Sequence, residues 1–475
     1  MIFSPPRARK LRTLAVLPVS LLFLGAAPSE APIALPGASG KRESPLDVSG
    51  AVARDFPASA PGAAAVTPPG PASARPVTFD DALGLAAAAP AVAGAAEAAA
   101  TQARVGAAVS SLVANPSLTV QPGVARDPLD GQLKPLGEVT LLQGWNLSGL
   151  PGNRKAAVRA EGELLSAEAR AAALSRRLGA AQAWVELWAA QQTLADGLQE
   201  YEIAREFASR MARAAAAAAF TRAEAADAST YAAEAHVQAI QTEGEVADKG
   251  YSLAAAMGIR AADPLVAAGP LPAPPVPART DWGPLLAAAD RLPAVAARRL
   301  AADADRAREA EVRSARGWTL ATGVKGTRDY LGTWGAQAVL DLSFPLFDLG
   351  EREAAGQAAA AARALGEHQE ASAVAATELA RALHEVEHTQ EILDAADQEL
   401  LPAAAENARL REASMRAGET TVLEVLVARR GWAAARAKRT RALAAHAWAG
   451  VKVWLLLADV NLGAVPVAEP PGGKP

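Results

Sequence analysis

The sequence of 475 residues contains no cysteine. This absence excludes disulfides, thiolate metal sites, a cysteine nucleophile and lipid attachment through an N-terminal cysteine. Aromatic residues make up 4% of the chain, and the five histidines and four methionines are too few to indicate metal handling. The formal net charge of −4 leaves no basic footprint, so we expect no nucleic-acid partner.

Long apolar runs are also scarce. At the N-terminus, basic residues precede the apolar run Leu14–Leu24, and Gly25, Ala26 and Ala27 follow it. This pattern predicts a secretory signal over residues 1–27, because the run is too short to span a bilayer. No later segment offers 18 uninterrupted apolar residues, and Val451–Leu457 is the nearest. We therefore expect the mature protein to be soluble, or to enter a membrane as β-strands.

Proline-rich stretches divide the rest of the chain. Residues 28–76 carry ten prolines among Ala, Gly and Ser, which predicts a disordered tether. Residues 264–280 form a second proline-rich linker, and residues 461–475 form a disordered C-terminal tail. Between these segments we predict two repeats, at 77–263 and 281–460.

Both repeats follow one order: helix, two strands, long helix, return helix. In the first, helix from Thr78 to about Val113 precedes predicted strands at Pro116–Val124 and Glu138–Ser148, with a connection at Ala125–Gly137. In the second, helix from Asp281 to about Ala315 precedes strands at Trp318–Arg328 and Gly335–Phe344. The sequence thus predicts a mainly α fold with a small β part.

The turns between the long helices support the repeat. Thr221 and Glu224 form an S/T-x-x-E capping box at the start of the first return helix. Thr421 and Glu424, 200 positions later, form the same box at the start of the second. Gly418 lies where a helix C-cap favours the left-handed conformation, and Ala218 occupies the same place in the first repeat.

The long helices are unusual in length. Glu351–Arg416, with Pro402 inside it, would extend roughly 100 Å at about 1.5 Å per residue. Large apolar or aromatic residues recur at every seventh position, which predicts coiled-coil packing. The positions are Leu379, Val386, Leu393 and Leu400, with Leu383 between them, and Leu187, Leu194 and Tyr201 in the first repeat.

The strands pose a different constraint. Four strands per chain are too few to close a transmembrane barrel, which needs about eight, and an open sheet edge is excluded from lipid. If these strands enter a membrane, several chains must pool them, and three chains would supply about twelve by that count.

Over residues 77–460 the sequence resembles the TolC-type outer-membrane efflux proteins. The resemblance is carried by the duplicated unit, the strand-to-helix junction SFPLFDLGERE at Ser343–Glu353, and the stretch LLPAAAENARLREASMRAGETTVLEVLVARR. The first repeat departs from it at GWNLSGLPGNR, which begins at Gly144.

The resemblance implies a homotrimer with a pooled twelve-strand β-barrel in the outer membrane and a helical barrel of duplicated hairpins in the periplasm. Such a protein is a passive exit duct for small molecules or ions. It has no catalytic residues, no cofactor and no metal. Its partners are outer-membrane lipid, a periplasmic adaptor and, directly or through the adaptor, an inner-membrane pump.

The resemblance also assigns the hairpin turns. They lie at the periplasmic end, where adaptors dock, and correspond to Ala218, Ala219, Phe220, Thr221 and Arg222, and to Gly418, Glu419, Thr420 and Thr421. Glu424 matches an acidic position at the aperture, and Val427 stands where a second acid often occurs. Glu424 could line the aperture, cap its helix, or do both.

Three alternatives remain. The first is a type I secretion duct, and the second is a purely structural periplasmic coiled coil. The third is a secreted zinc metalloprotease, because His384-Glu385-Val386-Glu387-His388 satisfies H-E-x-x-H. Against the protease, no third histidine follows in the usual spacing, and Val386 falls on the heptad seam.

Two further groups have open interpretations. Trp145, Trp318, Tyr330 and Trp334 lie on or beside strands, as an aromatic girdle or as ordinary strand packing. The basic residues of the last helix are expected to form a solvated face that pairs with acids of neighbouring helices. They are Arg429, Arg430, Arg436, Lys438, Arg439 and Arg441.

Overall fold

The computed structural model describes residues 75–109, 115–329, 331–345, 347 and 350–458. The predicted signal segment, nearly all of the predicted tether and the predicted C-terminal tail lie outside these residues. The described chain is mainly α-helical with a small β part, as its sequence predicts.

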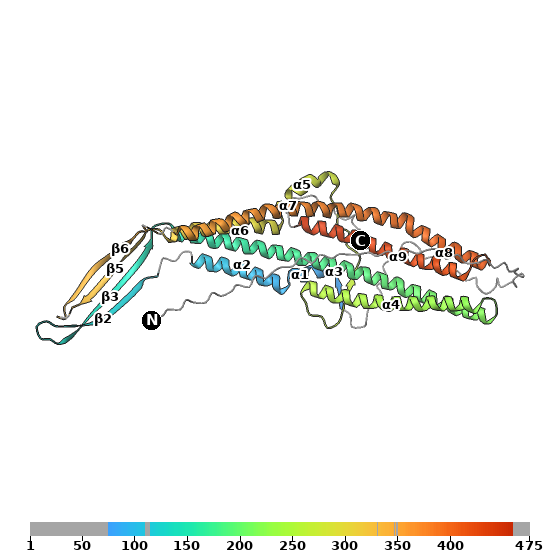
Figure 1. Cartoon of the computed structure of the whole chain (residues 1–475), viewed down its shortest axis with the longest axis horizontal. Coiled ribbons are helices and arrows are strands. Elements are labelled where there is room, and N and C mark those ends of the chain that lie inside the picture. Colours follow the sequence, from blue (N-terminus) through green and yellow to red (C-terminus); the bar gives the residue numbers. More distant parts are fainter. Residues whose placement is uncertain (1–74, 110–114, 330, 346, 348–349, 459–475) are drawn as a thin grey trace, which may run out of the picture. The chain divides into compact units, whose positions relative to one another are not determined.

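The order of elements is the same in both halves of the chain (Figure 1). The first half contains α1 (Phe79–Ala87), α2 (Pro90–Val109), β2 (Ser117–Arg126), β3 (Leu133–Asn146), α3 (Leu150–Ala216) and α4 (Arg222–Met257). The second contains α5 (Trp282–Ala287), α6 (Pro293–Ala315), β5 (Thr319–Arg328), β6 (Trp334–Ser343), α7 (Glu351–Ala395), α8 (Leu401–Arg416) and α9 (Val422–Ala458).

The helix α3 is the element against which most others pack. It contacts α2, α4, α6 and α9, while α7 contacts α6 and α9. Trp184 of α3 lies at the centre of the largest apolar cluster, with Leu187, Leu253 and Met257. Its indole Nε1 donates to the carbonyl oxygen of Val77 at 2.9 Å, so this buried polar atom is satisfied.

Two of the predicted helices are interrupted immediately before a proline. Instead of running unbroken from Thr78, the first ends at Ala87 and α2 begins at Pro90. Instead of running unbroken from Asp281, the second consists of α5, a 3₁₀ turn and α6, and Leu292 is extended (φ −56°, ψ 138°) before Pro293. The cause is steric, because proline disfavours the helical conformation of the residue before it.

The long helix of the second half is also modified near its proline. Between α7 and α8, Ala396–Leu400 form a π-helical segment just before Pro402. Proline lacks an N–H and its ring crowds the carbonyl four residues earlier, and a π turn relieves this without breaking the helix. Leu379, Val386 and Leu393 are buried as the heptad predicts, but Leu400 is 38% exposed. The extra residue of the π turn rotates Leu400 off the buried seam.

The strands form a four-stranded antiparallel sheet in the order β2-β3-β5-β6. Its strand positions agree with the sequence to within a few residues, except that the first connection is shorter than the predicted Ala125–Gly137. It comprises residues 127–132, since the strand pairing extends to Arg126 with Leu133.

A second sheet was not predicted. Strand β1 (Arg75–Thr78) pairs in parallel with β4 (Leu265–Ala268), so the end of the predicted tether and the predicted proline-rich linker each contribute to a strand. Leu265 and Ala267 are buried against α3 and α4. The sequence did not indicate this sheet because four-residue strands are too short to show a period of two, and because the pairing joins residues 190 positions apart.

Candidate functional site

One face of the four-stranded sheet is apolar although it is exposed in the single chain. The pairing registers Leu118↔Leu141, Leu141↔Val324 and Thr322↔Leu340 define this face, because side chains of adjacent residues alternate across a sheet. Its large members are Leu118, Val120, Val124, Leu133, Val139, Leu141, Trp145, Leu320, Val324, Trp334, Leu340 and Leu342. Its only charged strand residues, Arg126 and Arg328, lie at strand ends.

The opposite face is polar. Its Glu138 and Lys325 form an ion pair of 2.7 Å between neighbouring strands. Lys134 lies 3.0 Å from Asp130 and also pairs with Asp127 of the first turn. The other polar strand residues on this face are Ser117, Thr119, Gln121, Thr140, Asn146, Thr319, Thr327, Gln337, Asp341 and Ser343, and its large apolar residues are Leu136, Leu142 and Val339.

Tryptophans lie at both ends of the apolar face. Trp145 and Trp318, near the helices, are 44% and 54% exposed, and the Trp318 ring lies 5.7 Å from that of Phe344. Trp334, beside the second turn, is 69% exposed, with the Arg328 guanidinium 5.7 Å from its ring centroid. Of the predicted girdle residues, Tyr330 lies outside the described residues.

Both outer strands of this sheet pair on one side only within the described residues. β2 pairs with β3, and β6 pairs with β5, each over ten residues. An unpaired edge of this length is a template for another strand.

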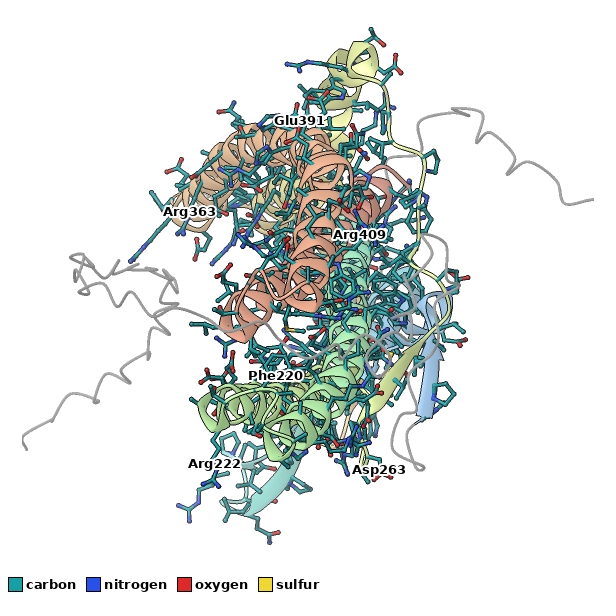
Figure 2. The ribbon with its side chains drawn as sticks, turned by 90° about the vertical axis from the view of Figure 1, so that its right-hand side faces the viewer. Phe220, Arg222, Asp263, Arg363, Glu391 and Arg409 are labelled. Carbon is teal, nitrogen blue, oxygen red and sulfur yellow. The ribbon has the colours of Figure 1, made fainter. Side chains whose placement is uncertain are left out.

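The turn between α3 and α4 contains a strained residue. Ala218 has φ +59° and is the one non-glycine residue with positive φ in the described part of the chain. The capping box that follows is complete, with the Glu224 N–H donating to Thr221 Oγ1 at 3.2 Å and the Thr221 N–H donating to Glu224 Oε2 at 2.9 Å. Figure 2 labels Phe220 and Arg222 at this turn, and Phe220 packs on a cluster that includes Met211.

The turn between α8 and α9 has the same form with different side-chain contacts. Gly418 has φ +74° at the position that Ala218 occupies in the first turn. The Glu424 N–H donates to Thr421 Oγ1 at 3.4 Å, while the Glu424 carboxylate accepts from Thr420 Oγ1 and from Arg411, each at 2.5 Å. The Thr420 hydroxyl, the Arg411 charge and Thr421 together hold the pKa of Glu424 below its usual value.

Exposed apolar residues accompany Glu424. Leu423 and Val427 lie four positions apart, and hence on one side of α9, and are 55% and 58% exposed. On another side of the same helix, Val422 and Leu426 are buried in a cluster with Met211 and Tyr231. That cluster joins the two hairpins near their turns.

A polar network also joins the hairpins, and of its members the sequence identified Arg436 but not Asp196, Glu200 or Tyr231. Glu200 of α3 accepts a 2.6 Å hydrogen bond from the Tyr231 hydroxyl of α4 and lies 3.3 Å from Arg436 of α9. Burial and the negative charge of Glu200 raise the pKa of Tyr231. Burial also raises the pKa of Asp196, although Arg436 lies 3.3 Å from it and opposes the shift. Glu200 and Arg436 lie 236 positions apart, so the tertiary packing alone brings this acid and this base together.

Most of the basic residues of α9 pair with acids of neighbouring elements as expected, but they do not all form a solvated face: Arg429 is buried, and the Arg436 side chain is only 13% exposed. Arg429 pairs with Glu412, Arg430 with Glu234 at 2.5 Å, and Arg439 with Asp397 at 2.6 Å. Among the described residues, Lys438 and Arg441 have no ion-pair partner.

The H-E-x-x-H motif lies on α7. The exposed His384 and His388 rings are 6.2 Å apart, while Glu385 pairs with Lys452 and Glu387 with Arg279. Glu385, which would act as the base of such a motif, is therefore engaged in an ion pair with a lysine. Within the described residues, no group of three or more His, Cys, Asp or Glu side chains is arranged to hold a metal ion.

The described helices differ in length and hydropathy. No single one of them is long and apolar enough to cross a membrane, whereas the pair Phe79–Ala87 and Pro90–Gly106, bent by 42°, meets the length and composition required.

The fold is that of the TolC-type outer-membrane channels. The chain is similar to the outer membrane channel CmeC of Campylobacter jejuni, with a TM-score of 0.67 and 15% identity over 80% of this chain and 86% of that one. It is similar to CusC, whose structures describe transmembrane channel formation, with a TM-score of 0.66 and 14% identity over 80% and 91%. The outer membrane protein VceC of Vibrio cholerae gives 0.64 and 14% over 80% and 95%. No family model and no curated protein matches the sequence.

Proposed function

We propose that the protein is one subunit of a trimeric outer-membrane channel that serves as a passive exit duct. The observation that carries this proposal is the four-stranded sheet, which has one apolar exposed face and one polar face. Lipid on the apolar side and water on the polar side would satisfy both faces. The tryptophans at the two ends of the apolar face have the places of interfacial anchors.

The open edges of the sheet support the trimer. In lipid, unpaired backbone groups cost several kcal/mol each, so β2 and β6 need partners. If β6 of each copy pairs with β2 of the next, three copies close a barrel of twelve strands, which lies in the range of known transmembrane barrels (about 8 to 26).

The long helical hairpins then extend the channel into the periplasm. Their turns, residues 218–222 and 418–421, are the surfaces that we propose for docking a periplasmic adaptor, which in turn engages an inner-membrane pump. Their rigid capping supports this role, because both turns present short exposed loops between well-packed helices. The cargo class that we propose is small molecules or ions, and energy comes from the inner-membrane partner.

Planar-bilayer recording on the purified mature protein tests the proposal. We expect discrete conductance steps from a species whose detergent-corrected mass is that of three chains. Protein denatured before reconstitution is the matched control and should not conduct. A monodisperse monomer that leaves the bilayer silent would overturn the proposal.

A further inference from the structure

The two arginines of the apolar face lie at one end of it. Arg126 ends β2 and Arg328 ends β5, and both strands run away from the helices toward the turns (Figure 1). Both residues are exposed. The strand residues of this face at the end beside the helices, among them Trp145, carry no charge. The apolar face is therefore asymmetric, because its strands carry cations at the turn end alone.

Neither arginine has an ion-pair partner among the described residues, although three acids lie in the adjoining turns. Asp127 and Asp130 both pair with Lys134, and Asp127 also accepts a 2.8 Å hydrogen bond from a backbone N–H of its turn. Asp329 accepts from two backbone N–H groups of its own turn, each at 2.9 Å. Since other groups hold these acids, the two arginines present positive charge at the turn end.

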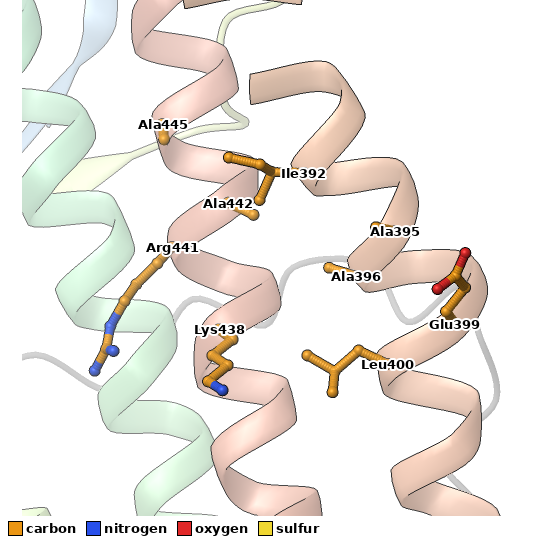
Figure 3. Close-up of a pocket in the computed structure, with 9 residues that line it drawn as sticks. All are labelled: Ile392, Ala395, Ala396, Glu399, Leu400, Lys438, Arg441, Ala442 and Ala445. Atoms are coloured by element: carbon orange, nitrogen blue, oxygen red, sulfur yellow. The ribbon is translucent and has the colours of Figure 1, made fainter. Parts of the chain in front are cut away.

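Cations without an ion-pair partner in the described chain also occur on the helices, in a different setting. Lys438 and Arg441 line a groove between α9 and the π-helical segment, and Glu399 lines the same groove (Figure 3). The strands of the apolar face carry no acid, so Arg126 and Arg328 border a wide apolar surface with no opposing charge on it.

Arg328 has a defined and open position. Its guanidinium lies 5.7 Å from the ring centroid of Trp334, its partner on β6. Its partner on β3 is Gly137, where the nearest atom to an added Cβ would be a backbone oxygen at 3.8 Å. A glycine there leaves the guanidinium uncovered on that side. An arginine beside an indole is also the combination expected at a membrane interface, where both side chains combine an apolar body with a polar tip.

The chemistry of this end fits a phosphorylated lipid. A guanidinium presents N–H groups in a fork that matches two phosphate oxygens. The apolar face continues directly from the arginines toward the helices, so acyl chains would lie on it while the headgroup stays beside the cations. A dissolved phosphate ion would use the arginines but leave the apolar surface uncovered.

We propose that Arg126 and Arg328 bind phosphate groups of lipid in the leaflet remote from the helices. The inference rests on the proposed function, which puts the apolar face in lipid, and it adds the headgroup chemistry and the leaflet. Under that function the helices extend into the periplasm, so the remote leaflet is the outer one. The ligand is then a phosphorylated lipid of the outer leaflet.

Lipid titration followed by native mass spectrometry of the full-length protein in neutral detergent tests this site. The probes are lipid A, a phosphorylated glycolipid, and the same lipid after removal of its phosphates. Arg126→Gln/Arg328→Gln should weaken the binding of lipid A by about 25-fold, and each single substitution by about 5-fold, since a cation beside anionic headgroups contributes about 1 kcal/mol. The dephosphorylated lipid should bind the wild type and the double variant equally.

Two controls accompany the titration. Arg222→Gln removes an exposed arginine that also has no ion-pair partner in the described chain, but at the opposite end of α3. It should leave the affinity for lipid A within about 2-fold, as surface substitutions usually do. Inorganic phosphate at the concentration of the lipid should not displace lipid A, because it lacks the apolar part. Circular dichroism confirms that the variants are folded.

The outcomes separate the two proposals. A conducting trimer that binds both forms of the lipid equally, or whose double variant binds lipid A as the wild type does, overturns the headgroup site and leaves the channel standing. Displacement of lipid A by inorganic phosphate also overturns it, in favour of a site for the free ion. A silent monomer overturns the channel, whichever lipid it binds. Phosphate-dependent binding that is lost in the double variant and kept in Arg222→Gln supports the site.

Discussion

The hydroxyl of Tyr231 donates to Oε1 of Glu200 at 2.6 Å, and both residues are less than 7% exposed. Arg436 lies 3.3 Å from the other carboxylate oxygen, so one buried acid holds together α3, α4 and α9. A buried carboxylate is stable only with such partners, and losing one leaves a desolvated charge.

Removing the hydroxyl should therefore weaken the packing of the hairpins. Tyr231→Phe is expected to lower the free energy of unfolding by about 1.5–3 kcal/mol, the range for a hydrogen bond to a charged group. Denaturant unfolding followed by helical circular dichroism measures it. Tyr251→Phe is the control, because that exposed hydroxyl makes one long bond of 3.4 Å, and an equal loss in both variants would contradict the role assigned to Tyr231.

Removing the arginine should cost more. The Arg436 and Glu200 side chains are 13% and 8% exposed, so Arg436→Met leaves the buried Glu200 and the partly exposed Asp196 without this cation. We expect a loss of about 3–5 kcal/mol, as for a broken buried ion pair. Arg363→Met removes an exposed pair with Glu367 and should cost less than about 0.5 kcal/mol. A loss in Arg436→Met no larger than in this control would show that the network contributes nothing.

The two turns offer a reciprocal substitution. Ala218→Gly should stabilise the protein by about 1 kcal/mol, because the left-handed conformation costs a residue with a Cβ about 1–2 kcal/mol. Gly418→Ala should destabilise it by a similar amount, since no atom lies within 4 Å of an added Cβ and strain alone decides the effect. Thermal unfolding compares the two, and changes of the same sign would contradict the equivalence of the turns.

The depressed pKa of Glu424 predicts a dependence on pH. A carboxyl whose folded pKa lies below its ordinary value of 4.5 contributes stability above that value, and the contribution is lost as pH falls through the folded pKa. The wild-type protein should therefore lose more thermal stability than Glu424→Gln when the pH is lowered from neutrality to below 4.5. If the melting temperatures of the wild type and of Glu424→Gln fall by the same amount across this range, Arg411 and Thr420 do not stabilise the charged form of Glu424.

The apolar face of the sheet predicts a side-specific effect on membrane insertion. Leu340 lies on that face and is 74% exposed, while Gln337 of the same strand lies on the polar face. Leu340→Arg should make folding into lipid less favourable by about 2–4 kcal/mol, whereas Gln337→Arg should have little effect. The fraction of protein that resists extraction from vesicles by urea measures the difference. Equal sensitivity would contradict a lipid-facing side.

Several elements were predictable because their causes are local. The capped turns at Thr221 and Thr421 are set by side chains within one helical turn of the backbone groups that they satisfy. The strands of the four-stranded sheet and the long helices follow from composition and period. Among the candidate site residues, the exposed turn positions and Glu424 could be located by their place in the repeat, whereas their roles in docking and at the aperture stay predictions.

The amino-acid sequence alone thus determined the helical class, the repeated order of elements and the position of each turn, since short-range sterics and capping decide them. Only the tertiary structure decided the pairing of β1 with β4, the partners of Glu200, and the rotation of Leu400 away from the buried side of its helix. The reason is that each of these depends on a residue distant in sequence or on a one-residue change of helical phase.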